Sequence, residues 1–74
     1  MAIRAVFAEN LKRFRGEQKI SQETLALKAG VERAYLGLLE RQKSSPTIDM
    51  VEKLAKVLKI EPHQLLQRFS KKRN

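Results

Sequence analysis

The stretch that decides the fold runs over residues 21–40, SQETLALKAGVERAYLGLLE. In its first half, Leu25 and Ala29 lie one helical turn apart and define an inward-facing stripe. In its second half, Leu36 and Leu39 lie three residues apart and define a second stripe. The stretch therefore predicts two short amphipathic helices in succession.

The junction between the two halves has the residues that a tight turn needs. Gly30 tolerates the positive φ that ends a helix, a conformation that a β-carbon would strain. Ala26 is small where the two backbones approach most closely, and Val31 anchors the corner. Two helices joined in this way form a helix-turn-helix, predicted here over residues 21–41, whose second helix lies in the DNA major groove. A helical hairpin with no DNA partner is the alternative interpretation.

The length and composition restrict the class of protein. With 74 residues, we expect one domain over residues 1–74, with a single modest core between residues 3 and 69. No apolar run approaches the roughly 18 residues that span a bilayer, and Glu9 and Lys12 interrupt the N-terminal apolar stretch before it resembles a secretory signal. A cytoplasmic, nucleoid-associated protein is therefore the default expectation. The chain has no cysteine, so it forms no disulfide and no thiolate metal site.

The formal net charge of +8 biases so short a chain toward polyanionic partners. Nucleic acid is the commonest partner of this kind, while a solvated surface and a membrane-surface helix are the alternatives. Charge together with the helical hairpin favours nucleic acid.

Further helices are expected on both sides of the hairpin. A helix over residues 2–18 has an apolar stripe made of Ile3, Phe7, Leu11 and Phe14. A helix over residues 48–59 has an inward face made of Val51, Leu54, Ala55 and Leu58. A last helix begins at Pro62, and its apolar face comprises Leu65, Leu66 and Phe69. Ser21 and Thr47 are the expected N-caps, and the basic tail over residues 70–74 is too polar to pack.

From about Phe7 to Phe69, the chain resembles the helix-turn-helix family of phage repressors, Cro proteins and their small bacterial relatives. The resemblance rests on Ile20-Ser21-Gln22-Glu23, Leu25-Ala26, Ala29-Gly30-Val31, Tyr35-Leu36, Leu39-Glu40-Arg41, Lys43, Ser45-Pro46-Thr47, Leu54-Ala55 and Leu58. It implies an all-α, lambda-repressor-like fold, a compact bundle of five short helices. It also implies a transcriptional regulator that binds a two-fold symmetric operator in double-stranded DNA as a homodimer. In its shortness the chain is similar to the controller proteins of restriction–modification systems.

Four positions depart from the family pattern. Gln42 and Lys59 stand where relatives commonly carry glycine at the end of a helix. Glu32 replaces the usual serine or threonine cap of the recognition helix, and Leu38 stands where a polar base-reading residue is common. These departures affect how the DNA sequence is recognised rather than the fold.

Base contacts are assigned to the outward face of the second hairpin helix, at Arg33, Ala34, Gly37 and Leu38. Arg33 suits this role best, because a guanidinium can donate two hydrogen bonds to guanine O6 and N7. A phosphate contact, or a solvated ion pair with Glu32, is its alternative. Ala34 and Leu38 suit thymine methyl groups, and Gly37 permits close approach; packing on another helix or at a dimer contact is the alternative for Leu38.

Contacts to the DNA backbone are assigned to Gln22, Tyr35, Arg41, Lys43, Ser44 and Ser45. The resemblance implies the role of Gln22, which the positive end of its helix assists. A half-buried tyrosine is the alternative for Tyr35, and a solvated surface is the alternative for the others.

Two further pairs have expected structural roles. The resemblance pairs Arg15 with Glu40 in a partly buried ion pair that fixes the recognition helix. Leu66 and Phe69, on the last helix, are the candidates for the two-fold interface.

No catalytic chemistry is expected. His63 has no second histidine or thiol with which to bind a metal, and no nucleophile accompanies the carboxylates. We therefore expect no enzyme activity, cofactor or small-molecule ligand, with DNA and a second copy as partners and RNA polymerase as a further candidate. An antitoxin-type module that binds a toxin and autoregulates on DNA is the alternative function.

Overall fold

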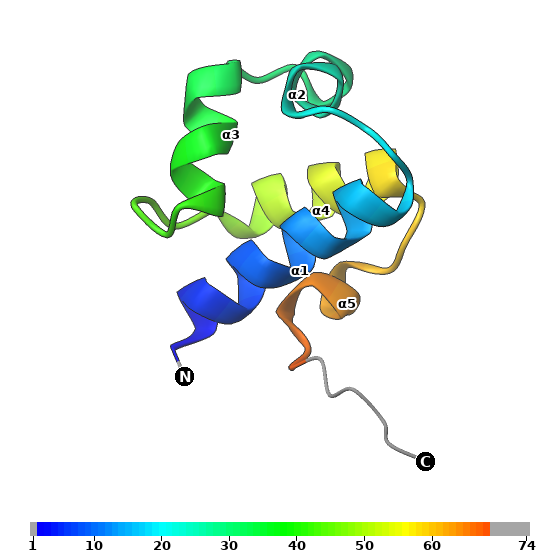
Figure 1. The fold of residues 1–74 in the computed structure, drawn as a ribbon. Helices are drawn as coiled ribbons and strands as arrows, with labels where there is room; N and C mark the ends of the chain where they lie inside the picture. The colour runs from blue at the N-terminus through cyan, green and yellow to red at the C-terminus, as the bar shows by residue number, and fades with distance from the viewer. Residues whose placement is uncertain (1, 69–74) are drawn as a thin grey trace.

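A computed structural model describes residues 2–68, which form five α-helices and, within that range, no strand (Figure 1). The helices are α1 (Ile3–Glu17), α2 (Gln22–Ala29), α3 (Arg33–Glu40), α4 (Ile48–Leu58) and α5 (Pro62–Leu66). Helix α1 packs against α3 and α5, α2 packs against α3 and α4, and α4 packs against α5. The predicted all-α bundle of five short helices is confirmed. Phe69 and the tail over residues 70–74 lie outside the described residues.

The helix starts follow the capping residues in the sequence. The Ser21 hydroxyl accepts a hydrogen bond from the Thr24 amide, and the Thr47 hydroxyl accepts one from the Met50 amide, both at 3.0 Å. Each bond satisfies one of the amides that a helix leaves unpaired in its first turn. Helix α3, in contrast, begins after Glu32 with no side-chain cap.

Four helices end in the same way, with one residue in the left-handed region: Lys19 (φ 56°), Gly30 (φ 73°), Gln42 (φ 63°) and Lys59 (φ 60°). The amide of the next residue then donates to the carbonyl five residues before it, in the pairs Ile20–Arg15, Val31–Ala26, Lys43–Leu38 and Ile60–Ala55. This is the Schellman motif, which satisfies the last carbonyls of a helix. Gly30 adopts this conformation without strain, as predicted. At Lys19, Gln42 and Lys59 the β-carbon makes the same conformation less favourable by about 1–2 kcal/mol each.

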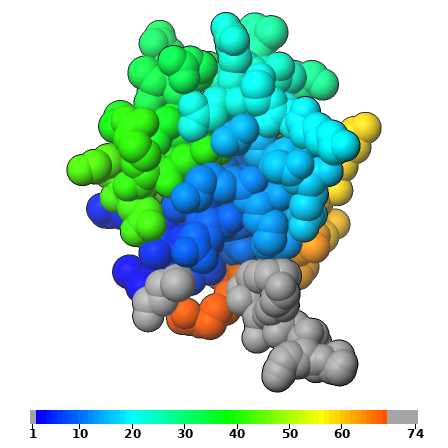
Figure 2. Space-filling view, in the orientation of Figure 1, coloured from blue at the N-terminus to red at the C-terminus, as the bar shows by residue number. Residues whose placement is uncertain are grey.

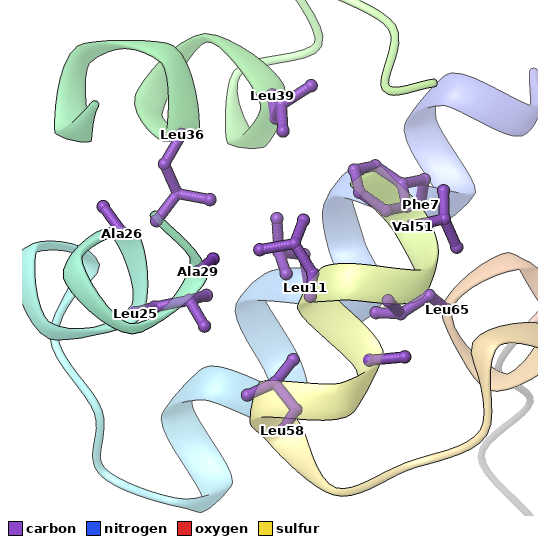
Figure 3. Packing of buried hydrophobic residues seen from close by; sticks show 12 residues of the cluster. Phe7, Leu11, Leu25, Ala26, Ala29, Leu36, Leu39, Val51, Leu58 and Leu65 are labelled. Atoms are coloured by element: carbon purple, nitrogen blue, oxygen red, sulfur yellow. The ribbon is translucent and has the colours of Figure 1, made fainter. Parts of the chain in front are cut away.

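The core lies where α1, α2, α3, α4 and α5 converge (Figure 3). Every inward position predicted for α2, α3 and α4 is buried, namely Leu25, Ala29, Leu36, Leu39, Val51, Leu54, Ala55 and Leu58. The prediction for α1 was wrong at Ile3, which is 60% exposed because, in the first turn of α1, it lines an open apolar pocket instead of the core. Val6 and Ala8 are buried as well as Phe7, because α1 is covered by both α3 and α5.

Two side chains, one in α1 and one directly after it, bind the ends of later helices. Asn10, 1% exposed, donates from Nδ2 to the carbonyls of Leu65 (2.9 Å) and Gln67 (2.8 Å). Gln18 donates from Nε2 to the Leu58 carbonyl at 2.7 Å. A helix as short as α5 is unstable alone, so its position depends on such tertiary bonds.

The left-handed conformation of Lys59 leads to a stability prediction. Lys59→Gly removes the β-carbon strain at the end of α4, and we expect it to raise the free energy of unfolding by about 0.5–1 kcal/mol after the entropy of glycine is deducted. Urea unfolding followed by circular dichroism measures the change. Lys53→Gly, at an exposed position inside the same helix, is the control and should destabilise by about 1 kcal/mol. A loss of stability in both variants would contradict the prediction.

Candidate nucleic-acid interface

Helices α2 and α3 place their exposed side chains on one continuous surface along the top and left of Figure 2. On α3, Arg33, Ala34 and Leu38 are exposed, and Arg41 is exposed directly after the helix ends. Tyr35 is half-buried, with its ring packed against the core. The outward face of α3 therefore presents three of the four predicted base-reading residues to solvent.

Gly37 is the exception, because it is buried. A β-carbon built on it would lie 3.2 Å from Nη1 of Arg41. Gly37 therefore lies on the outward face of α3, as expected, but the exposed side chain of Arg41 covers it in this conformation. The backbone of Gly37 becomes accessible only when that side chain moves away.

The expected ion pair between Arg15 and Glu40 is present. Arg15 donates from Nε to Glu40 Oε2 at 2.7 Å and from Nη2 to Oε1 at 2.9 Å, and its Nη1 donates to the Ile20 carbonyl at 2.9 Å. The two parallel bonds form the bidentate geometry that is strong and directional for arginine and carboxylate. The hydrogen bond to Glu40 and its negative charge raise the pKa of Arg15, although burial opposes them. Arg15 is therefore charged at any physiological pH.

Gln22 links this pair to the start of α3. It donates from Nε2 to Glu40 Oε1 at 2.9 Å, and its Oε1 accepts from Arg33 Nη1 at 3.2 Å. Because a carboxylate only accepts, the amide group of Gln22 faces Glu40 and its oxygen faces α3. Bonds thus run without interruption from Arg15, through Glu40 and Gln22, to Arg33. The family resemblance assigned Gln22 to the DNA backbone, and these two bonds give it a role within the protein as well.

The loop over residues 41–47 extends this surface beyond α3. Lys43 and Ser45 are exposed and Ser44 is half-buried. Arg4, near the start of α1, donates from Nε to the Ser45 hydroxyl at 3.0 Å. The sequence alone does not point to Arg4, because no local pattern relates two residues that lie 41 positions apart. It also missed the structural role of Asn10, although a polar residue three positions after Phe7 on an apolar stripe was a detectable signal.

We also searched residues 2–68 for a metal site and for a membrane-spanning helix. This part of the chain has no group of three or more histidine, cysteine, aspartate or glutamate side chains able to hold a metal ion. No helix in the same range is long and apolar enough to cross a membrane.

The arrangement of α2, the turn and an exposed α3 defines a helix-turn-helix protein. The model of the helix-turn-helix family HTH_3 matches residues 11–65, and the chain belongs to this family. This match confirms the predicted helix-turn-helix protein of this family.

Three similar proteins illustrate the family. Control protein C.SmaI of Serratia marcescens is 37% identical over 68 residues, covering 92% of this chain and 81% of that protein. A hypothetical transcription factor of Neisseria meningitidis serogroup B is 38% identical over 64 residues, covering 86% of this chain and 60% of that protein. The crystal structure of the restriction–modification controller protein C.AhdI of Aeromonas hydrophila matches with a TM-score of 0.81 at 37% identity, covering 84% of this chain and 94% of that one. The chain thus spans less than two thirds of the Neisseria relative.

Removing one partner of the ion pair should destabilise the bundle. We expect Arg15→Ala to lower the free energy of unfolding by about 3 kcal/mol, because it leaves the carboxylate of Glu40, 4% exposed, without its counter-charge. Urea unfolding measures the loss. Lys12→Ala, at an exposed position on the same helix, is the control and should change stability by less than about 0.5 kcal/mol. If Arg15→Ala matched this control, the pair would not stabilise the fold.

Proposed function

We propose that this chain regulates transcription by inserting α3 into the major groove of a specific double-stranded DNA site, and that it does so as a homodimer on a two-fold symmetric operator. The observation that supports this most directly is the tethering of Arg33. This exposed guanidinium at the start of α3 is held by Gln22, which is held in turn by the Arg15–Glu40 pair. A base-reading side chain bound in this way loses less rotamer entropy on meeting DNA.

Arg33 is the principal base-reading residue in this proposal. Gln22 accepts from Nη1 alone, so Nε and Nη2 are left to donate to guanine O6 and N7. Ala34 and Leu38 lie further along the exposed face of α3, where their methyl groups suit thymine. Close approach of DNA to Gly37 requires Arg41 to move away, and a phosphate would attract that guanidinium.

Contacts to the DNA backbone surround α3. Gln22 keeps a second amide hydrogen for a phosphate, and Tyr35 offers its hydroxyl. Past the end of the helix lie Arg41, Lys43, Ser44 and Ser45, which have cationic or hydroxyl groups. These contacts position the protein and contribute affinity that depends on salt but not on DNA sequence.

The proposal extends to the biological setting. The chain spans most of the length of C.SmaI and C.AhdI, which supports a restriction–modification controller as the particular kind of regulator. Leu66 on α5, 41% exposed, belongs to the proposed dimer interface, whereas Phe69 lies outside the described residues. We assign the protein to the cytoplasm with the nucleoid, with RNA polymerase as a further partner, and we assign it no catalytic reaction.

Selection of duplexes from a random pool tests the proposed function, with Arg33 as the variable. The parent protein should enrich a two-fold symmetric motif with half-sites about one helical turn apart. Arg33→Ala should weaken binding to that motif by about 1–3 kcal/mol and relax one base pair in each half-site. Arg33→Lys keeps the charge without the two-pronged geometry, so it should lose the same discrimination but retain affinity for random DNA. Equal losses on selected and random duplexes would contradict base reading by Arg33.

Lys43 should behave differently, as a residue that contacts phosphate. Lys43→Gln should weaken binding to every DNA sequence alike and reduce the slope of log K against log salt concentration by about one. Fluorescence anisotropy titrations at several salt concentrations give this slope. Lys53→Gln removes an exposed lysine of α4, outside the proposed interface, and should leave the slope unchanged. An unchanged slope for Lys43→Gln would exclude a phosphate contact there.

A further inference from the structure

The outward face of α3 carries a glycine, and the side chain that lies over this glycine comes from Arg41. Gly37 is buried although it lies on the side of α3 away from the core. A β-carbon built on it would lie 3.2 Å from Nη1 and 3.9 Å from Cζ of Arg41. The guanidinium of Arg41 therefore occupies the space in which any other residue at position 37 would place its own side chain.

Helical geometry explains how Arg41 reaches this space. Its amide donates to the Gly37 carbonyl at 3.0 Å, so Arg41 continues the path of α3 by one residue. Side chains on a helix lean toward its N-terminus, and each residue stands above the residue four positions before it. The side chain of Arg41 thus runs back by about one turn, which is about 5.4 Å, over Gly37. Although Arg41 follows the helix in sequence, its charge lies over the helix.

The position of this charge favours a base rather than a phosphate. At about 100° per residue, the exposed face between Arg33 and Leu38 spans about 140° around α3, and position 41 lies near its middle. When a recognition helix lies in the major groove, side chains at the middle of the inserted face meet the base edges. Side chains around the margins of that face meet the DNA backbone instead. Arg41 lies at the middle.

The guanidinium of Arg41 also keeps its donors free for a ligand. Within residues 2–68 its side chain has no hydrogen-bond or ion-pair partner. Arg33, in contrast, already donates from one nitrogen to Gln22. A guanidinium only donates, and guanine is the base that presents two acceptors, O6 and N7, in the major groove. The chemistry and the position of Arg41 therefore both match guanine.

We infer that Arg41 is a second base-reading residue, which donates two hydrogen bonds to a guanine, and that Gly37 determines this specificity by leaving room for the guanidinium. The inference rests on the proposed insertion of α3 into DNA, and it replaces the phosphate contact proposed above for Arg41 with a base contact. Gly37 then contributes the space it leaves rather than a close approach of its backbone to DNA. Because Arg33 lies about one turn before Gly37, the two arginines reach different base pairs.

Selection of duplexes by the full chain tests the base contact. The parent should enrich a guanine in each half-site at a position that Arg33→Ala leaves unchanged. Arg41→Lys keeps the charge but loses the two-pronged geometry, so it should lower the preference for that guanine by about tenfold. Its slope of log K against log salt concentration should remain that of the parent. Lys43→Gln is the matched control, because it should reduce the slope and leave the motif unchanged.

Gly37→Leu tests whether the glycine acts through Arg41. Leucine is the better helix former and this position faces away from the core, so the variant should fold, which urea unfolding checks. It should displace the guanidinium and lower the preference for the same guanine by about tenfold. When Arg41→Lys is already present, Gly37→Leu should lower this preference by no more than about a further twofold. Losses that multiply in the double variant would overturn the role assigned to Gly37.

The inference and the proposed function fail in different ways. A parent protein that enriches no motif overturns the proposed function, and the inference with it. A motif that Arg33→Ala relaxes at one position, but that Arg41→Lys leaves intact at every position, overturns the inference alone.

Discussion

The bidentate pair between Arg15 and Glu40 is the constraint on which the rest of the structure depends. It joins the end of α3 to α1, and Gln22 adds α2 to the same carboxylate. A buried charge that loses its partner is very costly, so the three helices have little freedom to shift relative to one another. The hydrogen bond from Arg33 to Gln22 connects the predicted recognition surface to the same three helices. Fold stability and the orientation of the base-reading side chain therefore depend on one set of bonds.

The helix ends are the second constraint. Each of the first four helices turns sharply into the next segment through a left-handed residue, and only one of these residues is glycine. At Gln42 and Lys59 the family pattern has glycine, and here the same closure forms with a side chain in place. The chain accepts backbone strain at these positions because the closing bonds satisfy the last carbonyls and fix the path into the next helix. The departures from the family pattern thus reduce stability without changing the topology.

The sequence predicted local structure well, because local structure follows from periodicity and end signals within a few residues. The stripes of α2, α3 and α4, the caps at Ser21 and Thr47 and the turn at Gly30 are all of this kind. The errors and omissions are tertiary. Ile3 lines an open pocket instead of the core, and Gly37 is covered by the side chain of Arg41. The bonds from Gln22 to Glu40 and from Arg4 to Ser45 join residues 18 and 41 positions apart, which no local pattern relates.

The loop over residues 41–47 connects α3 to α4 and belongs to the proposed DNA interface. Lys43 and Ser45 lie within the proposed DNA interface, and Ser45 and Pro46 also line an apolar pocket beside Ile48. Helix α1 binds both α3 and the loop. Arg15 donates to Glu40 at the end of α3, and Arg4 donates to Ser45 in the loop. The proposed phosphate-binding loop therefore has a fixed position relative to α3. Because α1 binds both the loop and the end of α3, the proposed phosphate contacts and the base-reading face keep a fixed geometry relative to each other, as positioning on a duplex through its backbone requires.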